Sequence, residues 1–159
     1  MNRDIYLISI PGLAIIVMDQ ISKSVISRTL GMYESIPVIK GFFDLVHVRN
    51  RGMAFGLMNK PSGDFSFYFL TAATFVAIGI VLFWFKGLKD EEKKMTFGFS
   101  LILGGAVGNL IDRLRFREVI DFLDFYIGHY HWPAFNVADS AITVGAFWVV
   151  INMILGSKK

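Results

Sequence analysis

The chain has 159 residues, of which 54% are hydrophobic and 18% are charged, and its mean hydropathy is +0.54. This composition is too apolar for an ordinary soluble domain, and because cysteine is absent, disulfides and thiolate-dependent sites are excluded. The net charge of +3 suits an anionic membrane surface. We expect no nucleic-acid partner, since no basic run alternates with aromatic residues.

Four apolar segments can each cross about 30 Å of hydrocarbon as a helix. The first follows Arg3, and because no small-residue cleavage site comes after it, we interpret it as an uncleaved span rather than a secretory signal. The four predicted spans cover residues 5–26, 65–85, 95–111 and 136–155. They predict an all-α membrane protein in which residues 1–159 form one integral-membrane domain, with external connections 28–64 and 112–135.

An even number of spans places both termini on the same side of the membrane. The total numbers of basic residues on the two sides are nearly equal, so the totals do not fix the orientation. The short loop 86–94 and the tail Lys158-Lys159 are the most basic segments next to span ends. We therefore expect both termini to be cytoplasmic.

Both external connections contain strand-like segments. Residues 42–49 are rich in β-formers and lead into the turn-rich segment 50–56, so a short sheet on the membrane surface is expected. In the second connection, Asp121 lies inside the apolar stretch 119–123. Desolvation there should raise the pKa of Asp121, although a surface strand with one solvated aspartate has the same pattern.

Polar side chains gather near one end of the predicted bundle, where the long connections emerge. Helical spacing places them on three faces: Asp19 with Lys23, Asn109 with Asp112 and Arg113, and Asn136 with Asp139. Each group could be a local structural pair, and for the first group alone that alternative is equally good. Three such faces at one depth favour a single polar site between helices, partly hydrated and enclosed by protein.

Asp139 is the most informative of these residues because it lies at the start of the apolar span 136–155. A carboxylate in a membrane span costs several kcal/mol unless it is protonated, paired or hydrated, which marks it as a candidate functional group. The alternative is an aspartate that only caps a helix near the interface. Gly104 and Gly108 lie one turn below Asn109 and favour close packing of helices beneath the polar site.

Three further features have simpler interpretations. His129 and His131 resemble half of a metal site, but no third ligand of matching type is near in sequence, so we expect no metal ion. Ser140 lies in no nucleophile motif, neither a Gly-x-Ser-x-Gly elbow nor a Ser-x-x-Lys pair. The phenylalanines of span 65–85 are expected to face lipid and to contribute to helix packing.

Five segments of the chain form a recognisable series: Asp19-Gln20-Ile21-Ser22-Lys23, Asn50-Arg51-Gly52-Met53-Ala54-Phe55-Gly56, Gly108-Asn109-Leu110-Ile111-Asp112-Arg113, Val119-Ile120-Asp121-Phe122 and Phe135-Asn136-Val137-Ala138-Asp139-Ser140-Ala141. Together they resemble the bacterial lipoprotein signal peptidases (signal peptidase II), and they occur in the order and spacing of that family. Each motif alone is weak, but five in order over nearly the whole chain are specific.

The resemblance implies a four-span aspartic endopeptidase with an extracytoplasmic β-sheet cradle in the bacterial cytoplasmic membrane. Such enzymes remove the signal peptide from prolipoproteins by cutting before a diacylglyceryl-modified cysteine. The family's catalytic aspartates fall on Asp121 and Asp139. Its supporting residues fall on Asp19, Lys23, Asn50, Gly52, Asn109, Asp112, Arg113, Asn136 and Ala138. Arg117 stands where many members have glycine, which puts the local turn in question but not the aspartate pair.

Two aspartates that share a site can hydrolyse a peptide bond without a metal ion or other cofactor. Mutual repulsion keeps one carboxyl protonated while the other acts as the base that activates water. The expected partners are lipid-modified prolipoproteins and membrane lipids, and the expected oligomeric state is a monomer.

A proton-coupled transporter or channel is the alternative from another class, but it should place carboxylates along a path through the bilayer. A purely structural membrane module would leave Asp121 unexplained.

Overall fold

The computed structural model describes residues 2–52, 64–87 and 94–156. Four helices in this part of the chain are long and apolar enough to cross a membrane. They are α1 (Asn2–Thr29), α2 (Phe65–Lys86), α3 (Lys94–Phe116) and α4 (Val137–Gly156). The predicted fold class, a four-span membrane protein with a small sheet, is confirmed.

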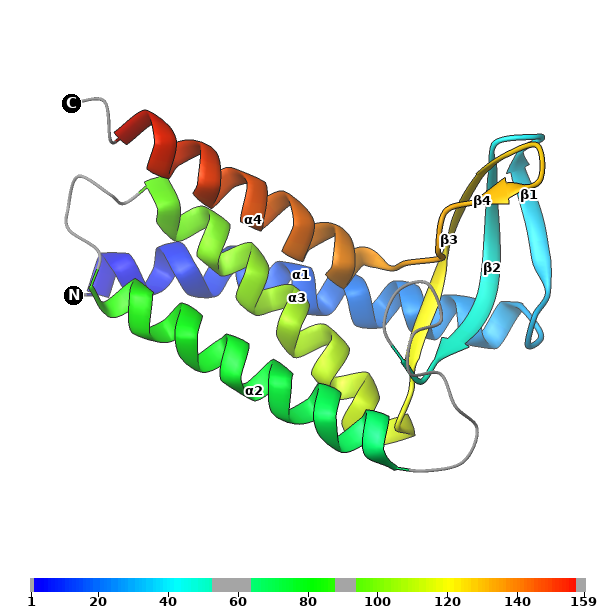
Figure 1. Cartoon of the computed structure of the whole chain (residues 1–159), viewed down its shortest axis with the longest axis horizontal. Helices are drawn as coiled ribbons and strands as arrows, with labels where there is room; N and C mark the ends of the chain where they lie inside the picture. The colour runs from blue at the N-terminus through cyan, green and yellow to red at the C-terminus, as the bar shows by residue number, and fades with distance from the viewer. Residues whose placement is uncertain (1, 53–63, 88–93, 157–159) are drawn as a thin grey trace.

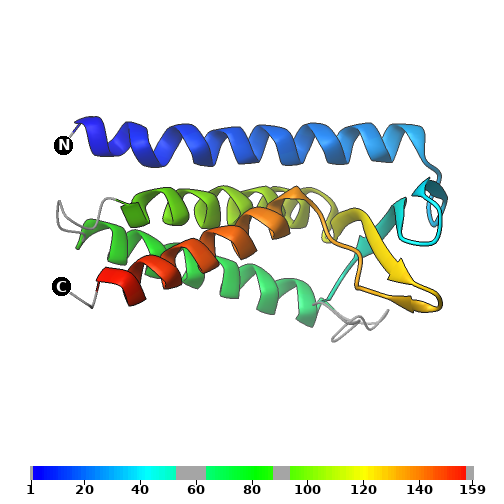
Figure 2. The same ribbon diagram turned by 90° about the horizontal axis from the view of Figure 1, so that it is seen from above.

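Helix α3 is the centre of the bundle, because it packs against α1, α2 and α4 (Figures 1 and 2). Glycine makes the close approaches possible. A Cβ at Gly104 would lie 2.6 Å from the Gly12 carbonyl oxygen of α1, and a Cβ at Gly105 would lie 2.3 Å from the Ala138 carbonyl oxygen of α4. The predicted close packing along this face of α3 is therefore confirmed, and it brings the polar residues of three helices together.

Helix α2 packs on only one side. Among its residues Ser66 and Leu70 are buried, whereas Phe65 and Phe75 are 70% and 55% exposed. Large aromatic side chains on the outer surface of an apolar helix suit a hydrocarbon environment, in agreement with the lipid-facing interpretation of this span.

A four-stranded antiparallel sheet lies at the end of the bundle opposite to both termini (Figure 1). Its strands, in sheet order, are β1 (Ser35–Ile39), β2 (Phe43–Asn50), β3 (Val119–Ile127) and β4 (Tyr130–His131). The strand-like segments of both connections correspond to β2 and β3, which pair with each other, so that Asp121 lies opposite Val48. The sheet thus joins the two connections directly above the polar end of the helices.

Helix α3 is longer than the predicted span 95–111, since it continues to Phe116 and includes Asp112 and Arg113. It ends at Arg117, whose φ of 61° is left-handed and whose N–H donates to the Arg113 carbonyl oxygen at 2.8 Å. A glycine commonly occupies this position at the end of a helix, because it adopts a left-handed conformation without strain. Arg117, which stands where many members of the resembling family have glycine, is therefore strained at its backbone. Residues 53–56 of the second motif, most of the 86–94 loop and the Lys158-Lys159 tail lie outside the described residues.

Candidate active site

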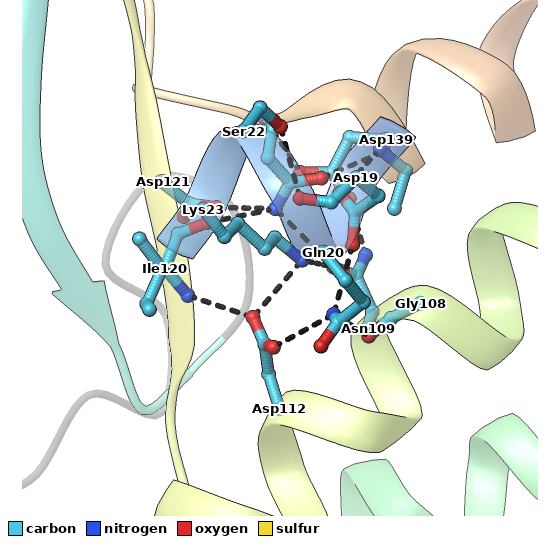
Figure 3. Close-up of polar contacts among 12 residues, drawn as sticks. Asp19, Gln20, Ser22, Lys23, Gly108, Asn109, Asp112, Ile120, Asp121 and Asp139 are labelled. Carbon is cyan, nitrogen blue, oxygen red and sulfur yellow. Dashed lines mark hydrogen bonds and ion pairs between the residues drawn. The ribbon is translucent and has the colours of Figure 1, made fainter. Parts of the chain in front are cut away.

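Asp121 and Asp139 line one cavity of about 550 Å³ at the junction of the sheet and the bundle. Asp121 comes from β3 and is 3% exposed, whereas Asp139 comes from the first turn of α4 and is half-buried. A strand and a helix thus present one carboxyl group each to the same space. The close-up in Figure 3 shows both groups beside the polar residues of α1 and α3.

Asn136 connects the two aspartates. Its Nδ2 donates to Asp121 Oδ1 at 2.7 Å, and its Oδ1 accepts the Asp139 backbone N–H at 2.9 Å. The Asn136 backbone N–H donates in turn to Asp139 Oδ2 at 3.3 Å. This reciprocal arrangement at residues N-cap and N3 is a capping box. Asp139 therefore does cap a helix, as the alternative interpretation supposed, and it also faces the cavity.

Two further asparagines complete the contacts of the aspartate pair. Asn109 Nδ2 donates to Asp139 Oδ1 at 2.8 Å, and Asn50 Nδ2 donates to Asp121 Oδ2 at 3.1 Å. Asn50 Oδ1 accepts the backbone N–H of the buried Gly52 at 2.9 Å, which holds the Asn50 side chain in place. All four carboxylate oxygens consequently accept a hydrogen bond from an N–H group.

A buried cluster of charges lies beneath the aspartate pair (Figure 3). Lys23 Nζ lies 2.8 Å from Asp19 and 3.0 Å from Asp112, and it donates to Asn109 Oδ1 at 2.9 Å. The three charged side chains are at most 2% exposed. The local Asp19–Lys23 pair of the sequence therefore exists, but it is one part of a network that links α1 to α3.

Backbone groups bind the same carboxylates. Asp19 Oδ1 accepts the Ala138 backbone N–H at 2.9 Å, and Asp112 Oδ2 accepts the Ile120 N–H at 3.2 Å. Ala138 is fully buried, with its methyl group close to Gly108, so a larger side chain would push α4 away from Asp19. The first turn of α4 and the start of β3 are thus fixed by carboxylates of α1 and α3.

Arg113 also lines the cavity, and its Nη1 lies 3.5 Å from Thr74 Oγ1 of α2. This arginine brings a positive charge close to Asp121 and Asp139. All eleven residues expected from the sequence therefore lie in the cavity lining or in the hydrogen-bonded network beneath it.

The burial of Asp121 raises the pKa of its carboxyl group to about 7, and the nearby charge of Asp139 acts in the same direction. The amide donors of Asn50 and Asn136 and the charge of Lys23 oppose this shift. The predicted direction is confirmed, and the alternative of a solvated surface aspartate is excluded by the 3% exposure of Asp121. A carboxyl group that titrates near neutrality can supply a proton in a reaction.

Some participants were not predicted from the sequence. Gln20 Nε2 donates to Asp112 Oδ1 at 3.0 Å and to the Gly108 carbonyl oxygen at 3.2 Å, and the motif Asp19-Gln20 was the available signal. The segment 132–135 lines the cavity with Trp132, Pro133, Ala134 and Phe135. His131 contacts Asp124 at 2.8 Å, and within the described residues no group of three histidine, aspartate or glutamate side chains could hold a metal ion.

The fold and the site together define a four-span integral membrane protein that holds two aspartates in one cavity at the end of its bundle. Comparison with known proteins identifies the family. The sequence profile of the family described as Signal peptidase (SPase) II matches residues 12–155. The chain belongs to this family, and it is an aspartic peptidase of the signal peptidase II type.

Individual relatives are similar in sequence to this chain over nearly its whole length. The chain is 42% identical over 159 residues to a lipoprotein signal peptidase of Syntrophus aciditrophicus, with 100% of this chain and 99% of that protein covered. It is 50% identical over 141 residues to a lipoprotein signal peptidase of Desulforapulum autotrophicum, with 88% and 86% covered. A bacterial membrane enzyme solved by the in meso method at 2.3 Å resolution superposes with a TM-score of 0.81 at 30% identity, covering 99% of this chain and 90% of that one.

Proposed function

We propose that Asp121 and Asp139 are the catalytic pair with which this peptidase removes signal peptides from prolipoproteins, just before the lipid-modified cysteine. The observation that carries the proposal is the convergence of both carboxyl groups on one cavity, with Asn136 in contact with each. Family membership supports the substrate class.

The chemistry follows from the arrangement of these groups. One carboxylate takes a proton from a water molecule, whose oxygen then attacks the scissile carbonyl carbon. The protonated partner donates its proton to the oxygen on which negative charge develops. When the carbon–nitrogen bond breaks, the proton taken from water passes to the leaving amine, and the partner recovers its own proton as the carbonyl re-forms. Repulsion between the two carboxylates, together with the burial of Asp121, keeps one proton on the pair near neutral pH.

The cavity wall suits a lipid-modified peptide. Beside the two aspartates it is lined by apolar side chains of the sheet–α4 connection and of α4, including Trp132, Ile142 and Val144. Trp132 and Val144 are 62% and 55% exposed, so the apolar wall continues onto the outer surface of the bundle. A substrate whose signal helix remains in the bilayer can approach the aspartates from that side.

The proposed location is the outer face of the bacterial cytoplasmic membrane, with both termini cytoplasmic and the enzyme acting as a monomer. The sheet lies at the end of the bundle opposite to the termini (Figure 1), and the cavity is lined by residues of β2, β3 and the first turns of α4 at this end, which supports one exposed site at the extracytoplasmic surface. The bias of basic residues toward the 86–94 loop and the C-terminal tail supports the orientation.

Cleavage of a synthetic prolipoprotein peptide by the purified enzyme in detergent tests the proposal. The peptide should be cut on the N-terminal side of the cysteine when this residue carries a diacylglyceryl group. The same peptide without the lipid should be cut far more slowly, because it cannot use the apolar wall. Equal cleavage of the two peptides, or cleavage at another bond, would contradict the proposed substrate class.

A further inference from the structure

Three asparagines around the aspartate pair have amide orientations that their neighbours fix. Asn109 Oδ1 accepts a hydrogen bond from the Lys23 ammonium. Asn136 Oδ1 accepts one from the Asp139 backbone N–H, and Asn50 Oδ1 accepts one from the Gly52 backbone N–H. An ammonium and a backbone N–H only donate hydrogen bonds, so each asparagine oxygen must face them. Each Nδ2 group is therefore forced to donate to a carboxylate.

The donors to the two aspartates differ in kind. Asp139 accepts one bond from a backbone N–H in the first turn of α4, and its other donor, Asn109, is itself bound to the Lys23 ammonium. The positive end of a helix dipole stabilises an anion at this position. Asp121 lies on a strand, accepts only side-chain amides among the described residues, and is buried more deeply than Asp139.

We infer that Asp139 enters the reaction as the ionised base and that Asp121 carries the single proton of the pair. This assignment rests on the proposed function. Asp139 takes a proton from water as the new carbon–oxygen bond forms, and the electron pair of the carbonyl π bond moves onto its oxygen. Asp121 donates its proton to that oxygen. When the tetrahedral intermediate collapses and the carbon–nitrogen bond breaks, Asp139 gives the proton that it took from water to the leaving amine. Asp121 recovers its proton from the hydroxyl group as the carbonyl π bond re-forms.

Other charges near the pair do not reverse the assignment. Lys23 and Asp19 of α1 lie beneath it, with Asp112 of α3 bound to the same ammonium. Arg113 of α3 brings positive charge to both carboxyl groups, with the larger effect at Asp139, which agrees with an ionised Asp139. Thr74 of α2 and Asn50 of β2 contribute neutral polar groups. The pKa of about 7 for Asp121 agrees with a proton on this residue at neutral pH.

The dependence of kcat/KM on pH in variants of Asn50 tests the assignment. Among the residues that the structure describes, the Asn50 amide donates to Asp121 alone, and loss of this donor disfavours the ionised form of Asp121. If Asp121 is the acid, Asn50→Leu should move the alkaline limb of the profile upward by about one pH unit and leave the acid limb in place. Asn50→Ser keeps a hydroxyl acceptor for the Gly52 N–H, so it should disturb folding less. It should move the alkaline limb of the profile in the same direction as Asn50→Leu.

Asn152→Leu is the matched control, because Asn152 lies far along α4, where its side-chain amide donates to the Trp148 carbonyl oxygen at 2.8 Å. It should move neither limb. An upward shift of the acid limb in the Asn50 variants would make Asp121 the base and overturn the assignment, while the proposed function would stand. Near-normal turnover by Asp121→Asn would instead overturn the proposed function itself.

A second measurement uses the unmodified enzyme and needs no variant. The epoxide 1,2-epoxy-3-(4-nitrophenoxy)propane is opened by an ionised carboxylate, so the ester it forms marks the base. Peptide mass mapping after labelling near pH 6 should find this ester on Asp139. An ester on Asp121 would contradict the assignment.

Discussion

Removal of the Asp19 carboxylate should destabilise the protein strongly, because this group is fully buried and binds two partners that remain buried. Asp19→Ala leaves the Ala138 N–H without its acceptor and takes one of two carboxylates from the Lys23 ammonium. Breaking a buried ion pair costs about 3–5 kcal/mol. Because Lys23 keeps Asp112 at 3.0 Å and Asn109 at 2.9 Å, we expect the lower end of this range.

A loss of about 3 kcal/mol should lower the melting temperature by about 6–12 °C for a chain of this size. The assay is thermal unfolding of the purified protein in detergent, with protein yield and turnover measured on the same preparations. Asp64→Ala is the control, since Asp64 pairs with Arg117 at the surface, where both side chains are more than half exposed. The Asp64→Ala variant should keep nearly the same melting temperature, because exposed ion pairs contribute little to stability. Full thermal stability of Asp19→Ala together with complete loss of turnover would refute this reasoning and place Asp19 in the chemistry.

Three further predictions concern the turn, the buried aspartate and the topology. Arg117→Gly should relieve left-handed backbone strain and lose the surface ion pair with Asp64, two effects of opposite sign, so the melting temperature should change by only a few degrees and turnover should not change. A large loss of activity would show that the guanidinium is needed. Because folding raises the pKa of Asp121 from 3.8 to about 7, the folded state binds the proton more tightly, and the free energy of unfolding should fall as the pH rises from about 4 to about 7. Asp121→Asn should flatten this dependence, and an unchanged slope would contradict the assigned shift. In the cysteine-free chain, Lys40→Cys should react with an impermeant thiol reagent from outside and Lys94→Cys should not; the reverse pattern would invert the orientation.

Much of this architecture was predictable because a bilayer imposes strong rules on sequence. The four spans follow from hydrophobic length, and β2 and β3 follow from short β-rich segments in otherwise polar connections. Strand β1 was not predicted, since Ser35–Ile39 is a short edge strand containing Pro37, and its residues are all exposed. The extension of α3 through Asp112 and Arg113 was missed because hydropathy falls where the helix leaves the apolar layer and enters the polar site.

The candidate site was predictable at the level of its residues but not of its contacts. Helical spacing placed Asp19 beside Lys23, and the structure confirms that pair at 2.8 Å. It could not show that Lys23 also binds Asp112 and Asn109, because those contacts depend on how α1 and α3 pack. Asn136 contacts both aspartates because β3 lies next to the start of α4, and the sequence does not show that arrangement either.

Turnover of a lipidated prolipoprotein peptide by Asp121→Asn and Asp139→Asn tests the central claim most directly. Asparagine keeps the size of aspartate but neither accepts nor supplies the catalytic proton, so each variant should fold, bind the peptide and fail to cleave it. The double variant should be no worse than either single one, because residues that act as one catalytic unit are non-additive. The wild-type enzyme should show a bell-shaped dependence on pH and keep its activity after treatment with a chelator. Near-normal cleavage by either asparagine variant, or loss of wild-type activity on removal of metal ions, would contradict the two-aspartate mechanism.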